Sequence, residues 1–208
     1  MSFEEKMNKI NHEIIKNTYI KLGNISDDIV FNSYSKIMEF VKRNNSIKDK
    51  ITLIGIAHVA YGWMPTMLDK IDLKLIENNG KIKKIWDNIQ SGSMDYDFLL
   101  SIKNIVNNSI IGGSKLLHFI NPNDYAIIDS NIVSFLLKKK NVFVDCNIEN
   151  YIIFMNRIKD LIKNKEEMNK IKEIFHENNR NIESFSDTRY IEMALFYSGK
   201  IEKRFNGT

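Results

Sequence analysis

The chain has 208 residues, enough for one large domain or two small ones, and 43% of them are hydrophobic, which excludes a disordered chain. A formal net charge of +4 makes it mildly basic, which is compatible with a nucleic-acid partner without demanding one. The single cysteine, Cys146, excludes a disulfide within the chain and fits a reducing cytoplasm, and the four scattered histidines show no metal-ligand spacing, so no metal site is predicted.

Apolar residues recur at helical spacing, and only two prolines interrupt them, so the chain is predicted to be an all-α helical bundle. In chain order, helices are predicted at residues 3–22, 26–41, 47–61, a short one from 66, 72–90 interrupted at 78–80, 95–108, 114–120, 129–140, 148–163, 166–178 and 186–198. Residues 141–144 are predicted as an isolated short strand.

Residues 51–68 carry no full charge and therefore require a comparison with a membrane span. Gly62 and Pro65 break the segment, and polar side chains interrupt it, which favours a buried helix that ends near Gly62. Neither a membrane segment nor an N-terminal signal peptide is expected. Residues 1–208 are predicted to form one helical domain with a hairpin motif at about 105–140. If this domain consists of two lobes, the hairpin is expected to lie between them.

The hairpin is centred on the sequence Gly112-Gly113-Ser114-Lys115. Residues 110–113 are predicted to form a turn that opens the next helix. Glycines without a Cβ would let the backbone N–H groups of Gly112, Gly113 and Ser114 approach a phosphate, and a helix N-terminus adds partial positive charge. Asp129 follows Lys115 by fourteen residues and is predicted to be the N-cap of its own helix. A lysine and a carboxylate at two successive helix starts can act as a nucleophile and its proton acceptor.

This pattern resembles the helix-hairpin-helix DNA glycosylases, particularly the 8-oxoguanine glycosylase branch, over about 25 residues from Ile110 to Phe135. The chain departs from the family pattern at Ile111, where a glycine is usual, and at Ile127, where a proline is common. The segment between Lys115 and Asp129 is also shorter than is usual in the family, by about one helical turn.

The resemblance implies a DNA-repair enzyme that binds double-stranded DNA and flips a modified base out of the duplex. Lys115 would attack the sugar C1′ as a Schiff-base nucleophile, and Asp129 would stabilise charge or accept a proton. The family suggests an oxidised purine as the substrate and strand cleavage by β-elimination as an accompanying lyase activity. No cofactor is expected, although a monovalent cation in the hairpin is compatible with the family.

Three further residues are candidates for the pocket that receives the flipped base: Tyr61, Trp63 and His118. The alternative for the two aromatic residues is core packing at a break between helices, and His58 is predicted to be a core histidine. Two lysine clusters suit either phosphates or solvent: Lys81, Lys83 and Lys84, and Lys138 to Lys140. Arg189 and Glu192 on the last helix are predicted to form a structural pair.

Two other functions remain open from the sequence. The chain can be a non-catalytic helical module that binds DNA or a protein partner, for example in a defence or regulatory system. It can also be a helical protein whose ligand is not DNA. Replacing Lys115 separates an enzyme from a binding module, because only the enzyme would lose turnover while it still binds DNA.

Overall fold

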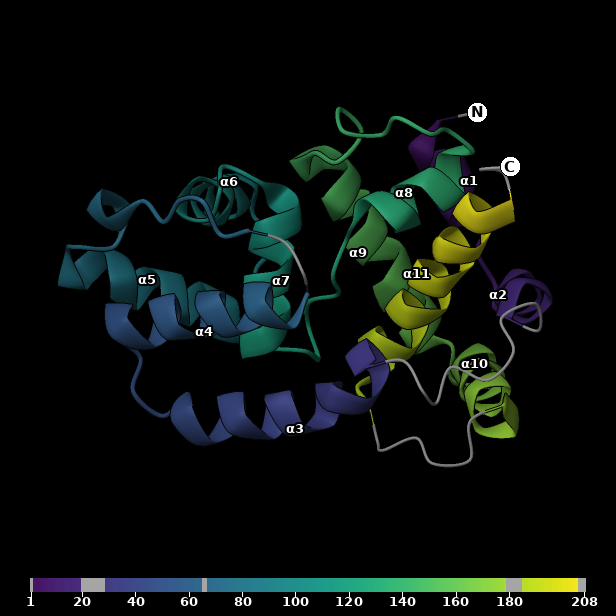
Figure 1. Ribbon diagram of the computed structural model, residues 1–208, viewed down its shortest axis with the longest axis horizontal. Coiled ribbons are helices and arrows are strands. Elements are labelled where there is room, and N and C mark those ends of the chain that lie inside the picture. Colours follow the sequence, from purple (N-terminus) through teal and green to yellow (C-terminus); the bar gives the residue numbers. More distant parts are fainter. Residues whose placement is uncertain (1, 20–28, 65–66, 179–184, 206–208) are drawn as a thin grey trace. The chain divides into compact units, whose positions relative to one another are not determined.

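The computed structural model describes residues 2–19, 29–64, 67–178 and 185–205. Within these ranges the chain forms α-helices joined by loops, and the only β pairing is an isolated bridge between Ile71 and Val106 (Figure 1). The all-α prediction is therefore confirmed. The helices are α1 (Phe3–Asn8), α2 (His12–Tyr19), α3 (Ile29–Asn44), α4 (Lys50–Trp63), α5 (Asn79–Gln90), α6 (Tyr96–Ile105), α7 (Ile110–Ile120), α8 (Ser130–Leu137), α9 (Ile148–Lys163), α10 (Lys165–Asn178) and α11 (Asp187–Phe205), with a 3-10 turn η2 (Leu73–Leu75).

The chain divides into two compact units, where the sequence predicted one domain over 1–208. Unit 1 consists of residues 1–31 and 128–208, and unit 2 consists of residues 32–127. Unit 2 is thus an insertion between two segments that pack together, and the predicted hairpin motif at 105–140 spans the boundary at residue 128.

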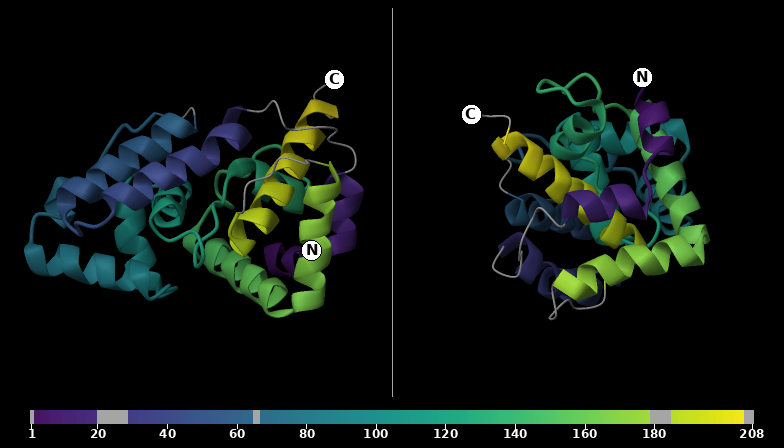
Figure 2. Two further views of the ribbon diagram at one scale, coloured as in Figure 1. Left: turned by 90° about the horizontal axis from the view of Figure 1, so that it is seen from below. Right: turned by 90° about the vertical axis from the view of Figure 1, so that its right-hand side faces the viewer.

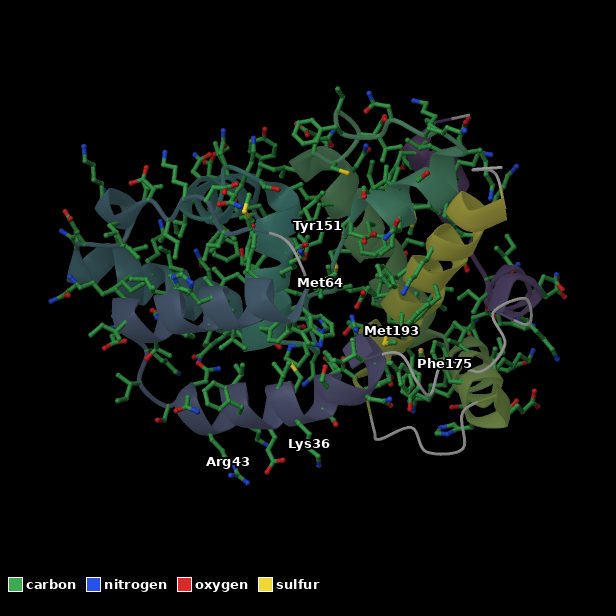
Figure 3. All side chains as sticks on the ribbon, in the orientation of Figure 1. Lys36, Arg43, Met64, Tyr151, Phe175 and Met193 are labelled. Carbon is green, nitrogen blue, oxygen red and sulfur yellow. The ribbon has the colours of Figure 1, made fainter. Side chains whose placement is uncertain are left out.

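Unit 1 is built around the packing of α8 against α11, with α1, α2, α9 and α10 around this pair. Large side chains from three helices fill its core, among them Tyr151, Phe175 and Met193, each at most 1% exposed (Figure 3). His12 at the start of α2 bonds Glu167 of α10 through its Nδ1 atom at 2.7 Å, which ties these two helices together at the surface.

Unit 2 has α7 at its centre, packed against α4 and α6. Helix α3 runs alongside α4 (Figure 2), and the indole N–H of Trp63 donates to Ser33 Oγ at 3.0 Å across this contact. Lys36 and Arg43 lie on the exposed side of α3 (Figure 3). Trp86 on α5 is 1% exposed and belongs to the core of this unit.

The sequence located most helix starts because their capping residues are local signals. Asn78, Asp95, Asp129 and Asn147 each accept a backbone N–H from the first turn that follows them. The predicted helix 3–22 is divided, because α1 ends at Asn8 and α2 begins at His12. The predicted helix starts at 26 and 66 lie outside the described residues.

Two predictions in unit 1 are wrong. Residues 141–144 form no strand, because the backbone N–H of Asp145 donates to the carbonyl of Val142 at 3.0 Å and closes a turn there. The last helix does not stop before Gly199 but continues to Phe205.

Candidate functional site

The connection between α6 and α7 is formed by Val106 to Ser109, not by the glycines. Asn107 and Asn108 have φ angles of 55° and 48°, a left-handed conformation that asparagine tolerates better than most residues. Ser109 is the N-cap of α7, and its side chain accepts from the N–H of Gly112. The predicted turn at residues 110–113 is therefore wrong, because α7 already begins at Ile110.

Asn107 fastens this connection to the segment before η2. Its backbone N–H donates to the Lys70 carbonyl at 2.9 Å, and its side-chain oxygen accepts from the Lys70 N–H at 2.8 Å. Its amide nitrogen donates to the Met67 carbonyl at 2.9 Å. Three hydrogen bonds from one residue hold the α6–α7 loop to residues 67–70, so the loop conformation is determined within unit 2.

Gly112 and Gly113 lie inside α7 and are buried. A Cβ added to Gly112 would lie 1.9 Å from the Tyr61 hydroxyl oxygen, and one added to Gly113 would lie 3.0 Å from the Ile102 Cγ2 atom. The two glycines therefore let α4 and α6 approach α7 closely. The N–H of Gly113 donates to the Ser109 carbonyl at 2.9 Å, and Ser114 is fully buried, so these residues do not form the open phosphate anchor that the sequence predicted.

Lys115 is on α7 and only 2% exposed. Its ammonium nitrogen lies 5.2 Å from the centre of the Tyr61 ring, within the range of a cation–π contact. Tyr61 is itself buried, and burial followed by the nearby charge of Asp69 raises the pKa of its hydroxyl to about 12. The phenol is thus uncharged across the physiological pH range. The lysine predicted to be the nucleophile lies in an enclosed setting beside a neutral aromatic ring.

Trp63 and His118, two of the predicted pocket residues, meet at Tyr34 of α3. The ring centres of Trp63 and Tyr34 are 5.7 Å apart, and the Nε2 atom of His118 lies 2.7 Å from the Tyr34 hydroxyl. The Nδ1 atom of His118 lies 2.7 Å from the Tyr125 carbonyl, which can only accept. Nδ1 therefore carries the proton, and Nε2 accepts from the Tyr34 hydroxyl. The third predicted pocket residue, Tyr61, instead contacts Lys115.

Because His118 is fully buried with both ring nitrogens bonded, replacing it should cost stability. His118→Phe leaves the Tyr34 hydroxyl and the Tyr125 carbonyl without this partner, so we expect the free energy of unfolding to fall by about 2–5 kcal/mol. His58→Phe on the exposed side of α4 is the matched control and should change stability by less than about 0.5 kcal/mol. Chemical denaturation of both variants measures this, and equal stabilities would contradict a structural role for His118.

Asp129 lies in unit 1, where it caps α8 as the sequence predicted. One of its carboxylate oxygens accepts from the backbone N–H groups of Asn131 and Ile132, each at 2.9 Å. The other accepts from the side-chain amide of Asn131 at 3.1 Å. These three hydrogen bonds hold the carboxylate in one orientation, and Asp129 as a whole is 8% exposed. Lys115, by contrast, belongs to unit 2.

Helix α11 carries a buried arginine–glutamate pair that lies near Asp129, the N-cap of α8. Arg189 and Glu192 are 3% and 2% exposed, and a guanidinium nitrogen of Arg189 donates to the Glu192 carboxylate. The sequence predicted this pair from its spacing of three residues but missed the state of Glu192. Burial and, to a smaller extent, the charge of Asp129 raise the pKa of Glu192 to about 7 against the opposing effect of Arg189. The available signal was a lone carboxylate in the apolar run from Tyr190 to Leu195.

The raised pKa of Glu192 predicts a pH dependence of stability. The folded state holds the proton up to about pH 7, whereas an unfolded glutamate releases it near 4.5. Between these values the folded chain binds more protons, so the stability contributed by Glu192 is present below pH 4.5 and lost as the pH rises to 7. Glu192→Gln cannot titrate and should flatten this part of the curve. Urea unfolding from pH 4.5 to 8 tests it, and an unchanged slope in the variant would refute the assignment.

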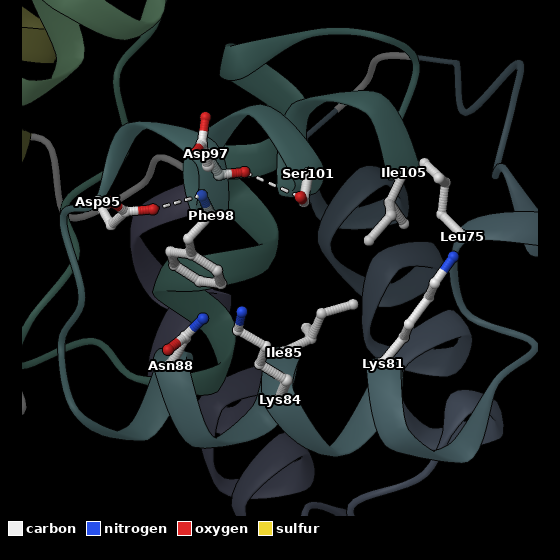
Figure 4. A pocket seen from close by; sticks show the side chains of 10 residues that line it. All are labelled: Leu75, Lys81, Lys84, Ile85, Asn88, Asp95, Asp97, Phe98, Ser101 and Ile105. Carbon is white, nitrogen blue, oxygen red and sulfur yellow. Dashed lines mark hydrogen bonds between the residues drawn. The ribbon is translucent and has the colours of Figure 1, made fainter.

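Unit 2 also contains an open cavity of about 360 Å³ between α5 and α6. Its lining includes Phe98 and Ile85 together with Lys81 and Lys84, two of the lysines for which the sequence left phosphate contact or solvent exposure open (Figure 4). Asp97 lies on the opposite side. The lysine and aspartate charges around the cavity balance, so its lining does not favour an anion over a neutral polar molecule.

Within the described ranges, no three histidine, cysteine, aspartate or glutamate side chains gather closely enough to hold a metal ion. The same part of the chain has no helix with the length and apolar character needed to cross a membrane. No family model, no curated protein sequence and no solved structure matches this chain.

Proposed function

We propose that the protein is a DNA glycosylase with an accompanying lyase activity, in which Lys115 is the nucleophile. The observation that carries the proposal is the enclosed Lys115 amine, 2% exposed and beside the Tyr61 ring. Lysine side chains are rarely buried to this extent. An amine removed from water and held against an aromatic wall is suited to attack on a sugar carbon.

In the proposed reaction the Lys115 nitrogen bonds to C1′ of a flipped nucleotide while the N-glycosidic bond breaks. The departing base takes the bonding electron pair and one proton. The C1′–O4′ bond then breaks as the imine forms, and O4′ takes that electron pair and a second proton, so the lysine nitrogen gives up both of its protons in all. Asp129 is assigned the role of proton acceptor or of stabilising positive charge on the sugar. Its three accepted hydrogen bonds favour the charged carboxylate that this role requires. The base removed is proposed to be a modified purine.

A second function has its own support. The N–H groups of Gly112 and Gly113 are engaged with Ser109, and Ser114 is buried, so the features that suggested phosphate binding serve packing in this structure. This arrangement is compatible with a non-catalytic helical module that binds DNA or a protein. Such a module would keep its affinity for its partner when Lys115 is replaced.

Borohydride trapping on duplexes that carry an abasic site or 8-oxoguanine tests the enzyme proposal. We expect a covalent protein–DNA adduct from the unmodified chain and none from Lys115→Met, which replaces the amine with an apolar group of similar length. Lys42→Ala, at an exposed lysine on α3, is the control and should form the adduct at an unchanged rate. Thermal unfolding of each variant shows that it is folded.

The two functions then separate. No adduct and no base release on either duplex, with DNA binding retained, would replace the glycosylase by the binding module. Absence of DNA binding at low salt would reject both DNA functions, because phosphate contacts are strongest under those conditions.

A further inference from the structure

The loop that joins α8 to α9 in unit 1 can be followed in Figure 1, and it carries two adjacent apolar side chains that are exposed to solvent. Phe143 and Val144 are each 84% exposed, more than any other large apolar side chain in the described ranges. Val142, directly before them, is 3% exposed and anchors the loop in the core. These two adjacent side chains form a small exposed apolar patch, and such a patch is a candidate binding surface when polar residues surround it.

The backbone beneath this tip is held by hydrogen bonds. The N–H groups of Asp145 and Cys146 donate to the Val142 carbonyl at 3.0 and 3.2 Å. The side-chain amides of Asn147 and Asn150 donate to the carbonyls of Val144 and Asp145 at 3.1 and 2.8 Å. The tip is therefore shaped before any partner arrives, which lowers the entropy lost on binding.

Positive charge borders the tip. Lys138, Lys139 and Lys140 precede it and are all exposed. Lys138 takes a left-handed conformation that ends α8, with its ammonium 4.2 Å from the centre of the Phe135 ring. Lys139 lies 3.6 Å from a carboxylate oxygen of Asp145, which offsets the acidic group nearest the tip. An apolar tip bordered by lysines complements a partner that has anionic groups on its outside and an apolar interior.

We propose that Phe143 and Val144 form a wedge that enters the base stack of duplex DNA, with Lys139 and Lys140 on the phosphates beside it. A base step accepts one or two apolar side chains, which is the size of this tip, and flanking lysines neutralise the backbone where the stack opens. The inference rests on the proposed function in taking DNA as the partner. The loop leaves the C-terminal end of α8, the helix that Asp129 caps, so wedge and carboxylate are separated by one helix of about 12 Å.

The test uses the full-length chain and a duplex with 2-aminopurine at successive positions, whose fluorescence rises when a base unstacks. The unmodified chain should raise the signal at one position or two neighbouring ones. A double variant, Phe143→Ala with Val144→Ala, should abolish this rise and weaken binding about tenfold, without changing the dependence of affinity on salt. Lys140→Ala should instead lower the salt slope by about one. Ile51→Ala, at a residue 71% exposed in unit 2, is the apolar control and should change neither property.

Two outcomes would overturn the inference, and a third would separate it from the proposed function. If the double variant binds DNA as tightly as the unmodified chain and still raises the fluorescence, the tip is not a wedge, whatever the borohydride experiment shows. If the tip is needed for binding to phosphatidylserine vesicles and not to DNA, its partner is a membrane surface. If the tip unstacks DNA and no Lys115 adduct forms, the wedge stands and the glycosylase proposal fails.

Discussion

Gly199→Ala is expected to lower the free energy of unfolding by about 3 kcal/mol, which corresponds to a fall of about 6–12 °C in the melting temperature. A Cβ at this position would lie 2.1 Å from the carbonyl oxygen and 2.5 Å from the carbonyl carbon of Asn131. These are backbone atoms at the start of α8, so no side-chain rotation relieves the clash. The two helices would have to separate, and their packing forms the centre of unit 1.

Gly55→Ala is the matched control for this experiment. Gly55 also lies within a helix, but a Cβ there would meet no atom within 4 Å. Alanine stabilises a helix interior by about 1 kcal/mol relative to glycine, so this variant should be neutral or slightly more stable. Differential scanning calorimetry on both proteins gives the comparison. A Gly199→Ala protein as stable as the Gly55→Ala protein would show that α8 and α11 do not approach as closely as described.

Gly112→Ala should lower the free energy of unfolding by about 2–3 kcal/mol, because the new Cβ would occupy the position of the Tyr61 hydroxyl. The distances to the hydroxyl oxygen and to Cζ of Tyr61 would be 1.9 and 3.0 Å. Tyr61→Phe removes the closer atom, so the cost of Gly112→Ala should fall by at least about 1 kcal/mol in that background. A double-mutant cycle measured by denaturant unfolding gives this coupling directly.

The control for the cycle is Gly62→Ala, next to Tyr61 in α4 but with open space at its Cβ position. It should show no coupling to Tyr61→Phe beyond about 0.5 kcal/mol. Additive effects at Gly112 and Tyr61 would mean that the ring does not press against α7. The position of the aromatic wall beside Lys115 would then need revision.

Local signals predicted a large part of this fold. Asp95, Asp129 and Asn147 were readable as helix starts because capping is a hydrogen bond between neighbours in the chain. Asn78 was predicted to interrupt a helix over 72–90, whereas it is the N-cap at which α5 begins. Apolar spacing predicted α9 from end to end because the side chains on one face of a helix recur every three or four residues. The candidate pair Lys115 and Asp129 was predicted from the same kind of local signal, a residue type at an expected helix start.

The glycines show where the sequence was insufficient. Gly112-Gly113 and Gly199 were interpreted as a turn and a helix end, which are the commonest local reasons for glycine. Each lies within a helix, because an aromatic hydroxyl, a side-chain methyl or a backbone carbonyl from another helix needs the space of the missing Cβ. The turn itself is formed by Asn107 and Asn108, whose left-handed conformation is held by bonds to residues 67–70.

Burial was likewise decided by the tertiary structure. His58 was predicted in the core and is exposed, whereas His118 is enclosed between Tyr34 and Tyr125. The sequence by itself determined the helical class and most helix starts, since these depend on residues a few positions apart. Only the tertiary structure decided which lysine is enclosed, which carboxylic acid keeps its proton and which glycines bring helices together, because these properties depend on side chains and backbone that are distant in the chain.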